Sequence, residues 1–254
     1  MTKLIGILNY TLNSFSDGAN FFSNEKALRQ IRKLFTDGAD VVDIGAIATS
    51  YGARLLTTAE EWQRLYPLLH QCASEKVSID TFYAETAKKA AELGIGYIND
   101  PSGGKDPKML EIIAAYPNIK YIFMFSFVLP ADRDTKVEHR DEIFEWGEKK
   151  IRECLSCGIQ KNQLIFDPGI GFATSAEQSF EVIKNIEEYR KLGIPVCVGH
   201  SRKSFFNLIS SFAPEERDIE TLSASIYMLM RNVDYLRVHN VAWHQRAFKV
   251  LQRL

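Results

Sequence analysis

The hydrophobic residues of this 254-residue chain fall into eight short runs, which alternate with polar loops and with segments of helical periodicity. Continuous apolar runs are typical of strands buried on both faces, and their alternation with helices predicts a parallel sheet. The predicted strands are residues 4–9, 41–45, 77–80, 97–100, 121–125, 164–167, 195–199 and 235–239. Helices are expected at about 24–35, from 59 onward, at 84–93, 141–157 and 176–192, and after the last strand.

Eight βα units in 254 residues match the length of about 250 residues that is typical of one (β/α)₈ barrel. The sequence therefore predicts an α/β fold of the TIM-barrel type, formed by residues 1–254 as a single domain. Two helix ends carry local signals. Thr58 followed by Glu61 resembles a capping box at the start of the second helix, and Gly94 is placed to end the third.

Charge excludes broad electrostatic functions. Lys and Arg number 31 against 32 Asp and Glu, and the net charge of -1 gives no general field for nucleic acid or an anionic membrane. We expect neither as a partner, so an anion has to be bound by local groups.

Cysteine content and the apolar runs predict the compartment. Four cysteines are too few for a disulfide scaffold, and the CxxC of Cys154 and Cys157 lacks a second pair or a nearby histidine for a metal site. The first residues do not resemble a secretory signal, and no run approaches the roughly 18 apolar residues of a membrane span. A soluble, cytoplasmic protein is predicted.

Polar side chains stand at the predicted strand ends. Loops at the carboxyl ends of barrel strands converge on one mouth, where the reacting groups of such enzymes lie. An isolated carboxylate there could equally shape a turn, but several that converge indicate a site, because like charges need a ligand or cation to offset them. The strand-end residues are Asn9, Asp43, Asp80, Asn99, Asp167, Lys203, Arg237 and His239.

Two groups suggest the ligand. Asp167, before a glycine-rich loop, could accept paired hydrogen bonds from an amino-pyrimidine edge, and Asn99 can donate and accept in one plane. Basic residues that suit a phosphate or diphosphate come from two late segments. They are Arg202, Lys203, Arg237 and His239, and the alternative for them, above all for Arg202, is a set of surface salt bridges.

Seven ordered motifs resemble dihydropteroate synthase and cover nearly the whole chain. They are GILNYTLNSFSDG, GADVVDIGA, SIDTF, INDPSGG, FDPGIGF, VGHSRKSFF and RVHN. The resemblance implies a (β/α)₈ barrel, commonly a homodimer. It also implies a transferase that condenses 6-hydroxymethyl-7,8-dihydropterin diphosphate with 4-aminobenzoate and releases diphosphate.

The resemblance also assigns roles to individual residues. Asp80, Asn99, Asp167 and Lys203 would bind the pterin, while Asn9, Arg237 and His239 would bind the diphosphate with Mg²⁺, for which Asn9 is the expected ligand. Lys203, Arg237 and His239 are the expected catalytic groups. The aminobenzoate side would be formed by Phe15, Thr49, Phe172 and Ser204.

The chain departs from the family pattern in three loops. Leu12 and Asn13 replace a proline and an acidic residue; Ile47, Ser50 and Tyr51 replace a glutamate, an arginine and a proline; and Phe125 replaces a histidine. Arg54 is a candidate to take the place of the lost arginine, beside the alternative of a solvated residue. Two other functions stay open, namely a diverged pterin-binding homologue with little synthase activity and a pterin-dependent methyltransferase.

Overall fold

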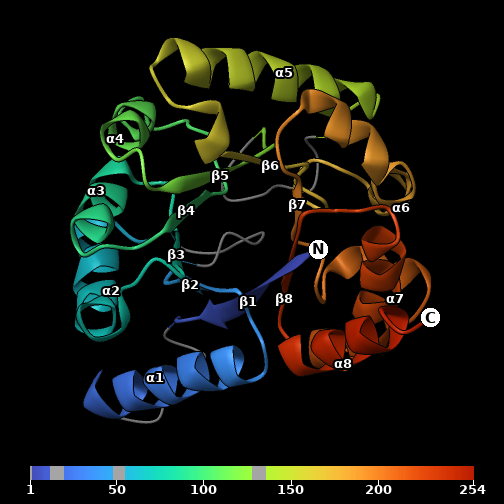
Figure 1. The fold of residues 1–254 in the computed structure, drawn as a ribbon, viewed down its shortest axis with the longest axis horizontal. Helices are drawn as coiled ribbons and strands as arrows, with labels where there is room; N and C mark the ends of the chain where they lie inside the picture. Colours follow the sequence, from blue (N-terminus) through green and yellow to red (C-terminus); the bar gives the residue numbers. More distant parts are fainter. Residues whose placement is uncertain (1, 12–19, 48–54, 128–135) are drawn as a thin grey trace.

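The computed structural model describes residues 2–11, 20–47, 55–127 and 136–254. Its strands form one parallel sheet in the order β6-β5-β4-β3-β2-β1-β8-β7. A parallel bridge between Phe166 and Val196 joins β6 to β7 and closes the ring. The predicted (β/α)₈ barrel is confirmed, and Figure 1 shows the helices arranged around the strands.

The strand bounds lie close to the predicted ones, whereas the helices over 109–115 and 218–229 were not among those predicted. The strands are β1 Lys3–Asn9, β2 Val41–Gly45, β3 Val77–Asp80, β4 Tyr97–Asp100, β5 Lys120–Met124, β6 Leu164–Asp167, β7 Cys197–Val198 and β8 Tyr235–Val238. The α-helices are α1 Asn20–Thr36, α2 Thr58–Cys72, α3 Ala84–Glu92, α4 Met109–Ala115, α5 Asp141–Ser156, α6 Ala176–Lys184, α7 Asp218–Leu229 and α8 Val241–Leu251. Short 3₁₀ helices are η2 Lys161–Gln163, η3 Ile186–Leu192, η4 Ser204–Leu208 and η5 Pro214–Glu216.

Two helix predictions need correction. The capping box of α2 is formed by Thr57 and Glu60, one residue before the predicted pair. The predicted helix over 176–192 breaks at Asn185, whose side-chain amide donates to the carbonyl of Glu181 at 2.9 Å and competes with the continuing helix. The chain continues as η3 and ends at Gly193, with φ +71°.

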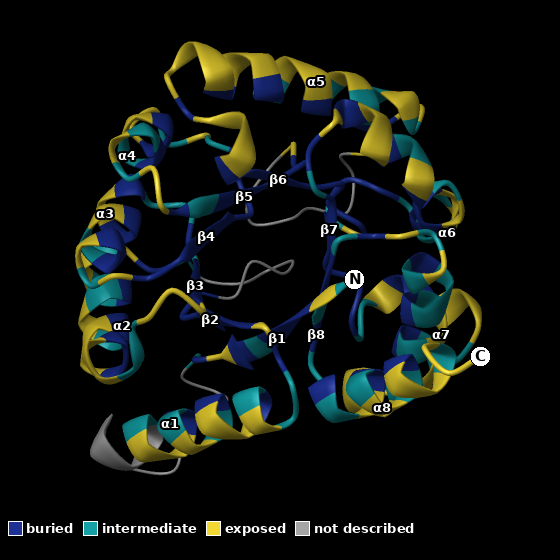
Figure 2. Cartoon of the chain, viewed as in Figure 1, coloured by how far each residue is buried: buried dark blue, intermediate teal, exposed yellow. Residues whose placement is uncertain are grey.

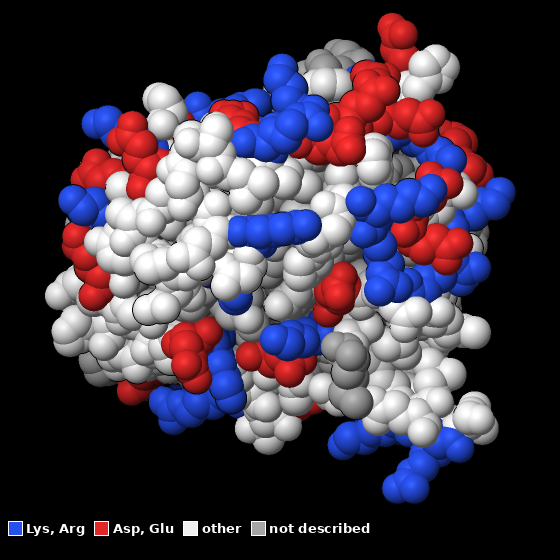
Figure 3. All heavy atoms as spheres, turned by 45° about the horizontal axis from the view of Figure 1, so that its top comes forward, with Lys and Arg blue, Asp and Glu red and all other residues white. Residues whose placement is uncertain are grey.

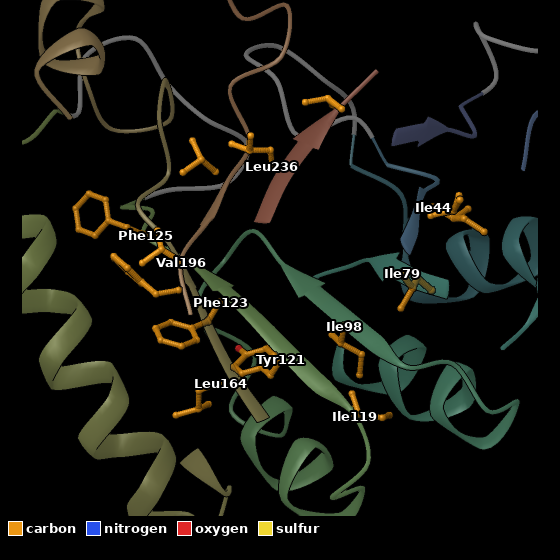
Figure 4. Close-up of a cluster of buried hydrophobic side chains, with 14 of the residues drawn as sticks. Ile44, Ile79, Ile98, Ile119, Tyr121, Phe123, Phe125, Leu164, Val196 and Leu236 are labelled. Carbon is orange, nitrogen blue, oxygen red and sulfur yellow. The ribbon is translucent and has the colours of Figure 1, made fainter. Parts of the chain in front are cut away.

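The main core lies between the strands and the surrounding helices. Figure 2 shows buried strands and helices whose buried faces turn toward them. Side chains such as Ile79, Phe123 and Leu164 point from the strands toward the helices in Figure 4. This sandwich of apolar side chains fixes the strands, and through them the positions of the strand ends.

A second, smaller apolar cluster fills the inside of the barrel. It takes one residue from each of seven strands: Ile5, Val41, Tyr97, Ile122, Ile165, Cys197 and Tyr235. Because side chains alternate along a strand, the residues two positions further on also point inward. The floor of the barrel is thus apolar, and the next layer toward the carboxyl ends holds the polar residues.

Candidate active site

The polar layer follows from the register of the strands. Asp43, Asn99, Asp167 and Arg237 each stand two residues after a member of the inner apolar cluster. Asp80 pairs in register with Gly45 on one side and Asn99 on the other, which places it in the same layer. Five strands therefore bring three carboxylates, one amide and one guanidinium to the same mouth.

Arg237 links the carboxylates of this layer. Its Nε donates to Asp43 Oδ2 at 2.6 Å and its Nη2 to Asp80 Oδ2 at 2.5 Å. Asn99 Nδ2 donates to the same oxygen of Asp43 at 3.1 Å. Burial raises the pKa of Asp80, the nearby charge of Arg237 opposes the rise, and the carboxyls of Asp43, Glu61 and Asp100 add to it. The structure thus brings Asp80, Asn99 and Arg237 together around Asp43.

Asp167 and Lys203 form a second pair of charged groups in the mouth. Burial raises the pKa of Asp167, while the charge of Lys203 and the amide of Gly169, which donates to Asp167 Oδ1 at 2.8 Å, oppose the rise. Burial lowers the pKa of Lys203 to about 8, and Asp167 opposes that fall. A Cβ on Gly199 would lie 3.5 Å from Asp167 Oδ2 and 3.9 Å from Arg237 Cδ, so this position borders both groups closely.

Phe172 lies beneath the lysine. The Lys203 ammonium is 4.5 Å from the centre of the Phe172 ring and donates to the carbonyl of Ile170. Ser204, the next residue, is exposed and begins η4. Phe15 and Thr49, the other residues predicted for the aminobenzoate side, lie outside the described residues.

Asn9 and His239 meet at the rim, on β1 and just after β8. Asn9 Nδ2 is 3.5 Å from His239 Nε2, and His239 Nδ1 is 2.9 Å from Ser201 Oγ. Burial, with the positive charges of Arg202 and Arg237, lowers the pKa of His239 to about 3. This shift, which arises from the protein's own groups, favours the neutral imidazole, so it does not support the positive charge that was expected of His239.

Arg202 pairs away from the mouth. Its Nε and Nη2 donate to the two oxygens of Asp218 at 2.7 and 2.9 Å, a bidentate ion pair with α7. Of the two alternatives for Arg202, the structure shows the salt bridge. The cations in the polar layer among the described residues are Lys203 and Arg237.

Two acidic residues have partners that the sequence did not indicate. Asp43 was among the predicted strand ends, but no role was predicted for it. In the structure it accepts hydrogen bonds from both Arg237 and Asn99. Such contacts across the barrel cannot be inferred from local residue spacing. Asp100 accepts from Ser102 and the Gly104 amide of its own loop and, at 2.8 Å, from the Tyr121 hydroxyl on β5.

Of the departures from the family pattern, two can be placed. Ile47 is buried directly after β2. Phe125 is buried against Trp146 of α5, with ring centres 5.3 Å apart, so its side chain belongs to the helix-facing core. Leu12, Asn13, Ser50, Tyr51 and Arg54 lie outside the described residues.

The described residues contain neither a metal-binding cluster nor a membrane-spanning helix. Within the described ranges, no group of three or more His, Cys, Asp or Glu side chains is arranged to hold a metal ion. The cysteines of the CxxC are free, Cys154 buried and Cys157 exposed. None of the described helices has the length and apolar character needed to cross a bilayer.

Fold and site together define a class of protein. It is a (β/α)₈ barrel whose mouth offers acceptors and an amide for the edge of a flat, nitrogen-rich ring, with two cations beside them for an attached anion. Comparison with known proteins agrees, because the model of the family described as pterin binding enzyme matches residues 5–239. The chain belongs to this family and, within it, to the dihydropteroate synthases.

Three relatives illustrate the likeness. Dihydropteroate synthase of Clostridium beijerinckii is 33% identical over 98% of this chain and 93% of its own length. The folate synthesis bifunctional protein of Chlamydia caviae is 39% identical over 97% of this chain but only 58% of its own length, so the chain spans little more than half of that relative. The crystal structure of dihydropteroate synthase from Anaplasma phagocytophilum with bound 6-hydroxymethylpterin-monophosphate has a TM-score of 0.89 and 37% identity, and covers 99% of this chain and 98% of that one.

Proposed function

We propose that this chain is a dihydropteroate synthase, a transferase of folate biosynthesis. It condenses 6-hydroxymethyl-7,8-dihydropterin diphosphate with 4-aminobenzoate and releases diphosphate. The observation that carries the proposal is the meeting of Asp80, Asn99, Asp167, Lys203 and Arg237 in one layer of the mouth. The Anaplasma relative that binds a hydroxymethylpterin monophosphate supports it.

The pterin ring is assigned to the carboxylates and the amide. Asp167 accepts from the amino-pyrimidine edge, and Asn99 and Asp80 complete the polar contacts around the ring. When diphosphate departs, positive charge develops on the pterin methylene and the attached ring. Three inward carboxylates around that ring stabilise the cation more than the uncharged ring of the bound substrate, which is the requirement for catalysis.

The diphosphate is assigned to Arg237 and to Asn9 and His239 at the rim. Arg237 is held between Asp43 and Asp80 and can exchange one of these partners for phosphate oxygens. Lys203, which lies close to Asp167, is assigned to the pterin, and His239 with Asn9 offers hydrogen bonds to the diphosphate at the rim. Negative charge that builds on the leaving oxygens is thus matched by Arg237, which borders the carboxylates assigned to the ring.

Mg²⁺ is assigned to the diphosphate and Asn9. This ion prefers oxygen ligands and is held by few protein groups together with substrate phosphates and water. A single amide oxygen at the rim fits such a site, and the described residues offer no cluster of three acidic or histidine ligands instead. When bound, Mg²⁺ would neutralise charge on the leaving group.

The second substrate requires little acid–base help. An arylamine is neutral at pH 7 and nucleophilic, so it needs positioning and exclusion of water more than a strong base. Phe172 and Ser204 lie beside Lys203 on that side, and Phe15 and Thr49 are proposed to complete it.

Turnover of the purified protein tests the proposal. With pterin diphosphate, Mg²⁺ and 4-aminobenzoate we expect dihydropteroate and diphosphate in equal amounts, measured by chromatography and a diphosphate assay. Binding of the pterin without product would instead indicate a diverged pterin-binding homologue and would reject the synthase. Methyl transfer from a methylated pterin to a corrinoid would identify the methyltransferase alternative.

We also propose that the protein is soluble and cytoplasmic and that it forms a homodimer. Free cysteines, one of them exposed, suit a reducing compartment. The surface agrees with small-molecule substrates, since Figure 3 shows Lys and Arg interspersed with Asp and Glu on the face in view.

A further inference from the structure

A buried glutamate lies directly behind the proposed pterin site. Glu61, on α2, is 0% exposed, and its Oε2 accepts from the Thr81 hydroxyl at 2.9 Å. Thr81 follows Asp80 in the chain, its amide donates to the carbonyl of Asn99 at 3.0 Å, and its hydroxyl accepts from the amide of Tyr83 at 3.2 Å. One hydroxyl therefore ties α2 to the turn that carries Asp80.

The surroundings of Glu61 favour the neutral acid. Among the described residues no cation lies within salt-bridge distance of it, and its second oxygen, Oε1, has no hydrogen-bond partner there. Burial raises its pKa from 4.5 to about 7, while the Thr86 hydroxyl, which lies nearby without a hydrogen bond of good geometry to Glu61, and the bonded Thr81 hydroxyl oppose the rise. A buried carboxylate without a counter-ion is costly, and a proton removes that cost.

Charged groups around Glu61 and Asp80 affect which of the two carboxyls is protonated. The carboxyl of Glu61 raises the pKa of Asp80, and the carboxyls of Asp43 and Asp100 act on Asp80 in the same direction. Arg237 faces Asp80 from β8, so it favours charge on Asp80. Tyr83 on the turn, Thr86 on α3 and Glu60 on α2 complete the neighbours of Glu61.

We propose that Glu61 is a positioning residue of the pterin site: it holds the turn of Asp80 through Thr81 and does so as the protonated acid, which leaves the negative charge to Asp80. This inference rests on the proposed pterin-binding function. It assigns a role to a residue that touches no substrate.

Pterin affinity tests the role without any need for turnover. Calorimetry with 6-hydroxymethyl-7,8-dihydropterin diphosphate is to be compared for wild type, Glu61→Gln, Glu61→Leu and Thr81→Val. Glutamine keeps an acceptor for Thr81 and the neutral charge, so we expect an affinity within about twofold of wild type at pH 6. Leucine at 61 or valine at 81 removes the link to Asp80, and we expect affinity to fall about tenfold.

Thr86→Val is the matched control for Thr81→Val. Thr86 is equally buried and also faces Glu61, but it stands on α3, away from the turn of Asp80. We expect its pterin affinity to stay within about twofold of wild type. Circular dichroism establishes that each variant is folded, and if Glu61→Leu fails to fold, the isosteric Thr81→Val decides the point.

The proton is tested by pH. A carboxyl whose pKa is raised in the folded state contributes its stability fully below pH 4.5, and that contribution is lost as the pH rises to about 7. Glu61→Gln should therefore melt at a higher temperature than wild type at pH 8 but gain less at pH 5. Between pH 7 and 9 the pterin affinity of Glu61→Gln should fall less than the pterin affinity of wild type. Lys203 titrates in both proteins, so its titration does not affect the comparison.

Three outcomes would overturn the inference. They are an equal loss of affinity in Glu61→Gln and Glu61→Leu at pH 6, unchanged affinity in both Glu61→Leu and Thr81→Val, and identical pH profiles of wild type and Glu61→Gln. If the wild type binds the pterin but makes no product, only the synthase proposal fails, and the affinities still decide the role of Glu61.

Discussion

At the scale of single residues, the mouth is organised by the imbalance between carboxylates and cations. Asp43, Asp80 and Asp167 face Arg237 and Lys203, so the described part of the layer has one acid more than it has bases. Burial raises the pKa of both Asp80 and Asp167, which reflects the cost of that charge. A bound ring that becomes positively charged during the reaction lowers the cost of these buried carboxylates. An anionic group attached to that ring can bind one of the two cations of the layer.

Arg237→Ala tests the double task of the arginine. We expect affinity for the pterin diphosphate to fall about 100-fold and affinity for the free pterin alcohol to fall less than about tenfold, because only the former has an anion to bind. Removal of the counter-ion of buried Asp43 should also cost about 3 kcal/mol of stability. Calorimetry with the two ligands and chemical denaturation measure these effects.

Arg202→Ala provides the control for Arg237→Ala. Arg202 is also an arginine near the mouth, but its guanidinium is occupied by Asp218. We expect the ratio of affinities for the diphosphate and the alcohol to stay as in wild type. An equal loss for the two ligands in Arg237→Ala would contradict the diphosphate assignment.

At the scale of elements, the sequence predicted positions better than partners. Strand ends such as Asn99 and Asp167 were located correctly, because an apolar run followed by a polar residue directly marks where a buried strand ends. The ion pair of Arg237 with Asp43 spans 194 residues, and only closure of the barrel brings the two together. Sequence spacing carries no information on such pairs.

The predicted start of α2 was wrong by one residue, and this exchanged the roles of Glu60 and Glu61. Successive residues of a helix point about 100° apart, so the cap decides which one faces the core. The prediction of Thr58 with Glu61 made Glu61 a capping side chain, whereas Thr57 with Glu60 forms the cap and Glu61 is buried behind the site. Adjacent threonines and adjacent glutamates offer the same capping pattern twice, so the pattern alone could not decide.

Thr57→Ala tests the cap. Thr57 Oγ1 accepts from the Glu60 amide at 3.2 Å, and Glu60 Oε2 accepts from the Thr57 amide at 2.7 Å. Loss of the first bond should cost about 1 kcal/mol, or about 2 °C in melting temperature for a chain of this size. Thr58→Ala is the matched control and should change stability by at most a few tenths of a kcal/mol, in the stabilising direction, because alanine is the better helix former. Calorimetric melting measures both variants. A larger loss of stability in Thr58→Ala than in Thr57→Ala would contradict the observed cap.

At the scale of the whole molecule, exposed apolar side chains are concentrated in one part of the chain. Eleven large hydrophobic side chains are exposed among the described residues, and eight of them belong to residues 208–254. A groove between α6, η4 and α7 contains Phe180, Ile183, Phe206 and Ile219, and Trp243 and Val250 on α8 are exposed as well. Surfaces of this kind mark interaction sites, and a two-fold dimer would bury the same patch on both copies.

Ile219→Lys tests whether a second copy covers this surface. Ile219 is 68% exposed at the groove, and a symmetric dimer places it in the interface twice, so loss of its burial counts twice. At about 1.5 kcal/mol for each copy, the dissociation constant of the dimer should rise about 100-fold. Analytical ultracentrifugation should show the wild type at twice 28.9 kDa and the variant shifted toward 28.9 kDa.

Leu155→Lys, at an apolar side chain on α5 that is 42% exposed, is the matched control and should leave the dimer unchanged. A monomeric wild type would reject the homodimer, and a variant as dimeric as the wild type would place the interface on another face.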